Sequence, residues 1–260
     1  MSVAESAAHT PDPPSGQVPP ADAPPSLLGR VVRLYTNPAR AWVGLDRKSQ
    51  WWFPLLVIVV VEVLLSAATY HRALLPDMLD RWDQAVANGQ MQPEQLQNLT
   101  KFFSESPIAL ATTLGSIVIV FPLVILIQAL VVWFGAGFVL GSKFRFGNGF
   151  AVITWSGMIS LPASLARYGF GWFRRSFEGL HLGLGVLLPD PDTPTKLHKG
   201  LSVFLDAISP FAAWYLVVVV LGTAALSGAP RRNVAWVLVT LYLAFVAFSA
   251  AIAALFSPGT

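Results

Sequence analysis

Five long apolar runs, separated by short polar or charged segments, dominate the hydropathy pattern of this sequence. In the longest, between Glu105 and Lys143, 37 consecutive residues carry no formal charge and no His. A helix needs only about 20 apolar residues to cross a bilayer, and a soluble domain rarely buries so long a run. The pattern therefore predicts an all-α, polytopic membrane protein with five transmembrane helices, at about residues 51–70, 108–141, 148–168, 209–227 and 233–256.

Two segments of different character precede the first span. Residues 1–26 contain seven Pro among Ala, Ser and Asp, a composition that predicts a disordered tail, either a partner-binding tether or a plain solvated terminus. Residues 27–50 repeat apolar positions every three or four residues with Arg between them, which is typical of amphipathic helices in the membrane interface, apolar face toward lipid. Asn37 and Pro38 predict a break between two such helices, with Asn37 as the N-cap of the second.

The polar connections also carry structure. Residues 71–106 contain two amphipathic pieces and predict a small helical lid on the membrane surface. The overlong second span is expected to kink at Pro122 and to leave the bilayer at its Gly-rich end. Residues 169–206 are ambiguous, because their apolar run from Leu180 to Leu188 is too short to span.

Charge predicts the orientation and excludes several functions. With the N-terminus cytoplasmic, the inner segments hold nine Lys and Arg and the outer loops eight, and the short loops favour this choice. The net charge of +3 is spread along the chain, so nucleic-acid binding is not expected. The absence of Cys excludes disulfides and thiolate chemistry.

Glu62 is the only charged residue inside the first predicted span. A charged side chain at this depth costs several kcal/mol unless it is protonated, paired or hydrated. Ser66 and Thr69 follow at spacings that place them on the same helix face as Glu62. This face is expected to point into the bundle, either as a proton or ion site or as a protonated carboxyl satisfied by a neighbouring hydroxyl or backbone group.

Gln128 is the one strongly polar side chain in the second span. It predicts either a hydrogen bond between helices, of about 1 kcal/mol, or a contact with a substrate. Small residues at helical spacing recur in the third and fifth spans and predict close helix packing. These positions are Ser156, Ser160, Ser164, Ala244, Ala247, Ala251 and Ala254.

Known intramembrane catalytic sets are absent from the sequence. A metalloprotease needs HExxH on one helix face, but every His lies outside the predicted spans. An aspartyl protease needs two intramembrane carboxylates, and only Glu62 is present. No nucleotide-binding GxxxxGK[ST] loop occurs. The sequence therefore favours a non-enzymatic protein with no catalytic residues, metal or cofactor.

Three stretches, taken in order and spacing, resemble a known family. They are Asn37–Pro38–Ala39 with Trp42 ahead of Trp52–Phe53–Pro54; Gly147–Asn148–Gly149–Phe150 leading to Leu161–Pro162; and Leu201 to Gly222, with Leu205–Asp206 and Trp214 inside it. Over about residues 30–256, the chain is similar to the Yip1 family of small five-span membrane proteins, in its bacterial form.

This resemblance implies a polytopic bundle with a cytoplasmic N-terminus and no catalytic residues. Eukaryotic relatives look like adaptors that bind prenylated Rab-type GTPases. The chain lacks the Asp-Leu-Tyr-Gly-Pro motif of those relatives, and its Ala-, Pro- and Arg-rich composition looks bacterial, so Rab binding is not expected. The implied location is a bacterial cytoplasmic membrane.

Two functions remain as hypotheses. The first is a scaffold or adaptor in the lipid bilayer that forms a homo-oligomer or binds another membrane protein. The alternative is a small-solute or ion transporter or channel that uses Glu62, Ser66 and Thr69, with Gln128, inside the bundle.

Overall fold

The computed structural model describes residues 24–47, 49–189 and 195–256, and these residues form helices without any strand. Five helical segments are long and apolar enough to cross a membrane. This confirms the predicted all-α, five-span fold. In chain order, they are α2 (Trp52–Thr69), continued by η2 (Tyr70–Leu74) and α3 (Leu75–Ala87); α5 (Pro107–Trp133) with η3 (Phe134–Val139); α6 (Phe146–Gly157), η4 (Met158–Ser160) and α7 (Leu161–Arg174); α9 (Pro210–Ser227); and α10 (Arg231–Phe256).

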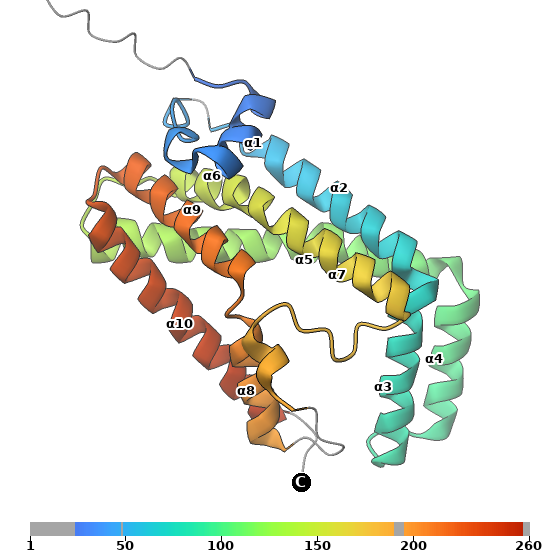
Figure 1. The fold of residues 1–260 in the computed structure, drawn as a ribbon. Helices are drawn as coiled ribbons and strands as arrows, with labels where there is room; N and C mark the ends of the chain where they lie inside the picture. The colour runs from blue at the N-terminus through green and yellow to red at the C-terminus, as the bar shows by residue number, and fades with distance from the viewer. Residues whose placement is uncertain (1–23, 48, 190–194, 257–260) are drawn as a thin grey trace, which may run out of the picture.

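The spans form one bundle with additional helices at each end (Figure 1). At one end lie α1 (Leu27–Thr36), beside η4 at the end of α6, and η1 (Pro38–Arg40), beside α9. At the other end, α3 and α4 (Pro93–Glu105) form a helical hairpin, and α8 (Lys196–Asp206) lies along α10. The short η5 (Leu184–Leu187) precedes α8.

Local capping explains where several helices begin. The Ser106 hydroxyl accepts a hydrogen bond from the Ile108 amide at 3.2 Å, and Ser209 accepts one from the Ala212 amide at 3.1 Å. These bonds satisfy amide groups that a helix start leaves unpaired. The predicted N-cap at Asn37, with Pro38 opening the helix, is confirmed, although the Asn37 side chain makes no capping bond and its backbone carbonyl accepts from the Arg40 amide at 3.0 Å.

The second span is a long helix, as expected from its uniform apolar composition. The α5 helix runs through Pro122 without ending and continues as the wider π-helical turns of η3. The chain then leaves the helix at Gly141, whose φ of +62° is a left-handed conformation that glycine adopts without steric cost. The helix therefore ends in the Gly-rich segment, at the place where the sequence predicts that the span leaves the bilayer.

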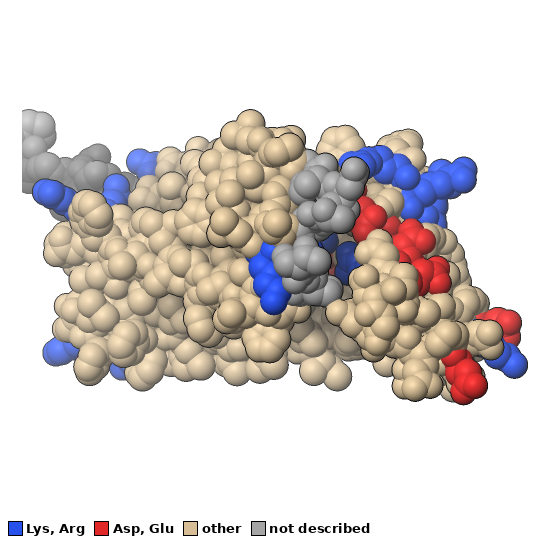
Figure 2. Space-filling model, turned by 90° about the horizontal axis from the view of Figure 1, so that it is seen from below, with Lys and Arg blue, Asp and Glu red and all other residues tan. Residues whose placement is uncertain are grey.

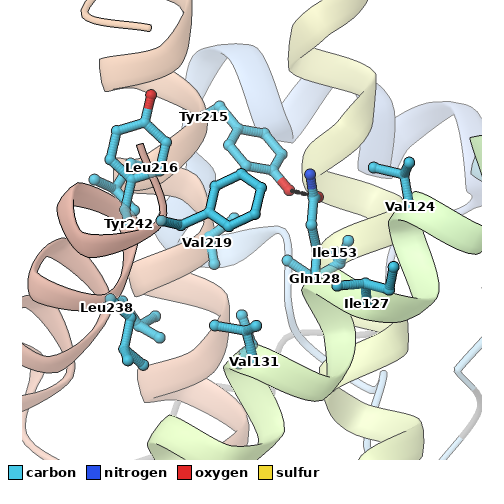
Figure 3. A pocket seen from close by; sticks show the side chains of 13 residues that line it. Val124, Ile127, Gln128, Val131, Ile153, Tyr215, Leu216, Val219, Leu238 and Tyr242 are labelled. Atoms are coloured by element: carbon cyan, nitrogen blue, oxygen red, sulfur yellow. Dashed lines mark hydrogen bonds between the residues drawn. The ribbon is translucent and has the colours of Figure 1, made fainter. Parts of the chain in front are cut away.

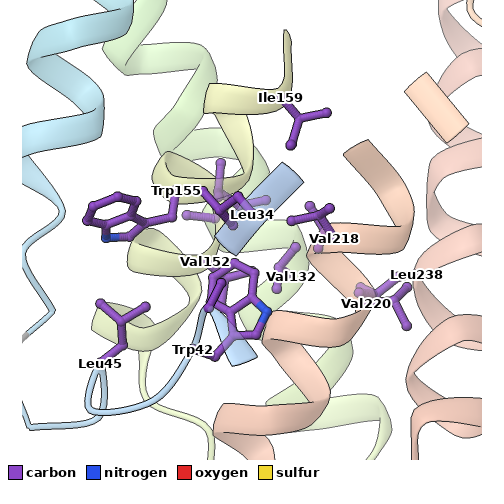
Figure 4. Close-up of a cluster of buried hydrophobic side chains, with 14 of the residues drawn as sticks. Leu34, Trp42, Leu45, Val132, Val152, Trp155, Ile159, Val218, Val220 and Leu238 are labelled. Atoms are coloured by element: carbon purple, nitrogen blue, oxygen red, sulfur yellow. The ribbon is translucent and has the colours of Figure 1, made fainter. Parts of the chain in front are cut away.

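Residues 24–47, here called the N-terminal cap, pack on the bundle through several of their apolar side chains. Leu34, Trp42 and Leu45 are at most 2% exposed and join the core formed by α5, α6, α9 and α10 (Figure 4). The predicted lipid contact is wrong for these side chains, because the ends of α6 and α9 offer an apolar protein surface at the same place. Leu28 and Val32 of α1 remain exposed.

In the view from below, Lys and Arg mark the end with the N-terminal cap at the left, an uncharged band follows, and charged side chains return from the middle of the face to the other end (Figure 2). The end with the N-terminal cap carries Arg at positions 33, 40, 47, 145, 231 and 232 and Lys143. Most of the acidic residues that the structure describes lie toward the opposite end, including exposed Asp80, Asp83, Glu94 and Glu105 of the α3–α4 hairpin. The uncharged band has the character that a bilayer core requires.

The hairpin is fastened to the end of α7 by two polar contacts. The Arg72 side chain donates a hydrogen bond to the Trp172 carbonyl at 2.8 Å, and its guanidinium lies 4.6 Å from the centre of the Trp172 ring. Buried Asp77 accepts a hydrogen bond from the Phe177 amide at 2.7 Å. These contacts hold the hairpin beside α7.

Candidate functional site

Glu62, Ser66 and Thr69 lie on one buried face of α2. Glu62 is 9% exposed, Ser66 2% and Thr69 3%. The face therefore points into the protein, because a polar group directed at lipid would lose its hydrogen-bond partners. Thr69 bonds back to the Leu65 carbonyl at 2.8 Å, within its own helix.

The carboxyl group of Glu62 meets α7. The Ser164 hydroxyl donates a hydrogen bond to Oε1 of Glu62. The Tyr168 hydroxyl, one turn further along α7, interacts with the side chains of both Glu62 and Ser66. Two hydroxyl groups of α7 thus meet the carboxyl, which joins α2 to α7 in the interior of the bundle.

Ser164 and Tyr168 are the partners that analysis of α2 alone does not find. The signal was present in the sequence as the serine ladder of the third span, which we interpreted as a packing surface. Ser156 is fully buried, and the Ser160 hydroxyl donates a hydrogen bond to the Gly157 carbonyl at 2.7 Å. These two serines therefore belong to the packing of α6 and η4. Only Ser164 reaches the carboxyl.

Gln128 lies on α5 and contacts a different helix. Its side-chain oxygen accepts a hydrogen bond from the Tyr215 hydroxyl of α9 at 2.8 Å. The predicted helix–helix hydrogen bond is therefore present. Gln128 and Tyr215 both line an apolar cavity of about 280 Å³ between α5, α9 and α10 (Figure 3).

Glu62 and Gln128 do not share a site in this arrangement. Glu62 is held by α7, whereas Gln128 is held by α9. Glu62 does not line the cavity that contains Gln128. The geometry thus gives two separate polar contacts between helices and does not assemble the four predicted residues into one pathway.

Arg30 is the most deeply buried cation of the N-terminal cap. It is 1% exposed, and its guanidinium donates to the carbonyls of Ala41 and Val43 and lies 5.3 Å from the centre of the Trp155 ring. Burial, with a smaller contribution from Arg33, lowers the pKa of Arg30 to about 10. Because this value remains far above 7, Arg30 is charged at neutral pH and joins the cap to α6 as a cation.

His181 and Asp206 form a further polar contact, at the end of the molecule opposite the N-terminal cap. Nδ1 of His181 lies 2.9 Å from both carboxylate oxygens of Asp206 at the end of α8. A Cβ atom on Gly185 would fall 2.1 Å from Oδ1 of Asp206, so the chain passes the carboxylate without room for a side chain. Within the described ranges, no group of three or more His, Asp or Glu could hold a metal ion.

These observations define a multi-pass integral membrane protein whose polar interior groups join helices to one another. The family model of the Yip1 domain matches residues 32–253, which is most of the chain, and the protein belongs to the Yip1 family. No curated protein and no solved structure matches the chain. The family assignment confirms the resemblance found in the sequence.

Proposed function

We propose that this protein is a non-enzymatic scaffold or adaptor that works by binding a second copy of itself, or another membrane protein, within the bilayer. The observation that carries this proposal is the uncovered face of α10. Only 11% of the apolar window of α10 is buried inside the protein, the smallest share among the five spans.

Small side chains lie on this uncovered face. Ala244, Ala247 and Ala251 are all exposed, at spacings that place them along one side of α10. Small residues let two helix backbones approach closely, which is how helices associate in lipid, where the hydrophobic effect does not drive them together. The larger Phe245 and Phe248, 61% and 64% exposed, flank the small residues and supply contact area.

The transporter hypothesis receives less support. The carboxyl of Glu62 is occupied by Ser164 and Tyr168, a geometry that suits a contact between α2 and α7. We interpret Glu62, Ser66, Thr69 and Gln128 as structural groups that need no cofactor. We place the N-terminus in the cytoplasm of a bacterial cell, since basic residues predominate at the end that carries the N-terminal cap.

Cysteine cross-linking in native membranes tests the proposed face. The chain contains no Cys, so a single introduced thiol reports on its own position. Ala247→Cys should form a disulfide-linked dimer on mild oxidation, because a residue near a two-fold axis meets its own copy. The matched control is Ile119→Cys on α5, where Ile119 is 72% exposed, and it should remain monomeric.

Purification in mild detergent tests the broader role. The parent should elute as a homo-oligomer or with a co-purifying membrane protein, and Ala247→Ile should reduce this association because the branched side chain separates the helices. A parent protein that is strictly monomeric and free of partners, with no difference between the two Cys variants, would refute the scaffold proposal.

A further inference from the structure

The cavity between α5, α9 and α10 has the features of a ligand site within the membrane. Its wall is apolar apart from Gln128 and the hydroxyl group of Tyr215 that is bonded to it, whereas the hydroxyl group of Tyr242 points away from the cavity to the Ala207 carbonyl (Figure 3). A small apolar pocket with a few converging polar groups is the usual form of a small-molecule site. This cavity is separate from the α10 face invoked for the scaffold role, and the inference below does not depend on that role.

The hydrogen bonds around the cavity leave one donor free. Tyr215 donates to the oxygen of Gln128, and the hydroxyl of Tyr242 donates to the Ala207 carbonyl. In the part of the chain that the structure describes, the amide nitrogen of Gln128 has no acceptor. An unsatisfied donor in a hydrocarbon environment costs several kcal/mol, so a ligand that brings an acceptor would be favoured.

The depth of the site separates it from the ester groups of phospholipids in the leaflet at the end with the N-terminal cap. Tyr242 lies on α10 about 15 Å beyond Arg232, and Tyr215 lies on α9 about 18 Å before Ser227, at 1.5 Å per residue. Measured from that end, the polar groups lie about half-way through a hydrocarbon core about 30 Å thick. An ester carbonyl of that leaflet lies too shallow to reach Gln128.

The charge and the size of the cavity restrict the class of ligand further. No Lys, Arg or His lines the cavity, so nothing there compensates a carboxylate or phosphate. The volume is about 280 Å³, whereas an apolar cavity of about 150 Å³ accommodates benzene. The cavity therefore fits one substituted ring rather than a whole lipid. The rings of Tyr215, Tyr242 and Phe245 provide flat apolar surfaces beside it.

We infer that this cavity binds the headgroup of a membrane-soluble quinone, with a quinone carbonyl accepting a hydrogen bond from the amide nitrogen of Gln128. A quinone is uncharged, carries its carbonyls on a single ring and enters the bilayer interior. The inference concerns binding alone and includes no redox step.

Photoaffinity labelling tests the site. The purified full-length protein in lipid nanodiscs is labelled with an azido derivative of a short-chain quinone, and the labelled peptides are mapped. Labels should fall on the lining segments 124–132, 215–219 and 238–245, and excess decylubiquinone should suppress them. Labels spread evenly over lipid-facing residues, and unaffected by competition, would show simple partition into the bilayer and overturn the inference.

Three variants separate binding from folding. Gln128→Leu removes the donor at similar size and should weaken competition by decylubiquinone about tenfold, as expected for one lost hydrogen bond. Ile127→Phe fills the cavity from its lipid side, where Ile127 is 49% exposed, and should abolish specific labelling. Ile119→Phe makes the same change away from the cavity and should behave as the parent. Each variant is compared only if it elutes as a single species with the parental melting temperature. If Ile127→Phe and Ile119→Phe both label like the parent, the site does not exist.

Discussion

The indole ring of Trp42 lies directly against Gly222 of α9. A Cβ atom built on Gly222 would fall 2.7 Å from Cζ2 of that ring. Real side chains do not approach so closely, so this position of α9 accepts only glycine while the cap is docked. Trp42 and Gly222 belong to two of the three stretches that resemble the Yip1 family, and the fold brings them into contact. The contact gives a physical reason for glycine at position 222 of this chain.

The substitution Gly222→Ala should therefore loosen the N-terminal cap. The added methyl group must displace the Trp42 ring, and overpacking of this kind costs about 1–3 kcal/mol. We expect a lower melting temperature in detergent, measured by intrinsic fluorescence. Gly115→Ala is the control, since no atom lies within 4 Å of the added methyl on α5. That change should be neutral or stabilising, because Ala favours helix over Gly.

A double-mutant cycle assigns the effect to this contact. Trp42→Leu removes the ring, so Gly222→Ala should cost little in that background, and the two free-energy changes should not add. Equal losses of stability for Gly222→Ala with and without Trp42 would show that the glycine acts elsewhere.

The spans could be predicted from the sequence because each depends on local composition. An uncharged run such as that between Glu105 and Lys143 must be helical in lipid, since only a helix satisfies its backbone groups within one segment. The surface that covers an amphipathic face cannot be predicted from local composition. Leu34 and Trp42 have the periodicity of an interfacial helix, and only the three-dimensional arrangement shows that α6 and α9, not lipid, cover them.

The candidate site was predictable in part for the same reason. The burial of Glu62 followed from the cost of exposing a carboxyl to hydrocarbon. Its partner Ser164 could not be chosen from the sequence, because it lies on another helix and the register between α2 and α7 depends on packing. The separation of Gln128 from Glu62 has the same origin: helical period places residues on a face, but it does not say which helix that face meets.

Glu62→Gln should preserve the fold. Gln keeps an oxygen that accepts the hydrogen bond of Ser164, and it removes any cost of a buried charge. We expect a melting temperature equal to or above that of the parent. Ser164→Ala should lower stability by about 1 kcal/mol, the range of hydrogen bonds between membrane helices. In proteoliposomes, an ion flux that is present in the parent and lost in Glu62→Gln would instead favour the transporter hypothesis.

Arg30→Lys should release the N-terminal cap although it conserves charge. The Lys ammonium is a point donor and cannot reproduce a planar guanidinium that serves two carbonyls and lies over Trp155. We expect faster tryptic cleavage within the cap, by several-fold. Exposed Arg40→Lys keeps the number of tryptic sites and should leave the rate unchanged.

The pH dependence of this effect follows from the pKa of Arg30. Burial lowers the folded-state pKa to about 10 from 12.5, so the folded protein holds the proton less tightly than the unfolded chain. The stability contribution of Arg30 therefore rises only as the pH increases through about 10, and it is constant between pH 7 and 9. The ratio of cleavage rates for the Arg30→Lys variant and the parent should be flat over that interval. A ratio that changes severalfold there would mean that another group controls the cap.

Asp77→Ala should free the chain that follows α7. Asp77 is 5% exposed and accepts the Phe177 amide at 2.7 Å, just after Arg175, whose left-handed φ of 59° ends the helix. Removing the acceptor leaves a partly buried amide unpaired, at a cost of about 1–3 kcal/mol. We expect faster hydrogen exchange in residues 174–180. Asp77→Asn keeps an acceptor oxygen and should restore much of the protection, and Asp80→Ala, on the exposed side of α3, should change nothing. If Asp77→Ala and Asp80→Ala exchange alike, the hairpin is held to α7 by Arg72 and Trp172 alone.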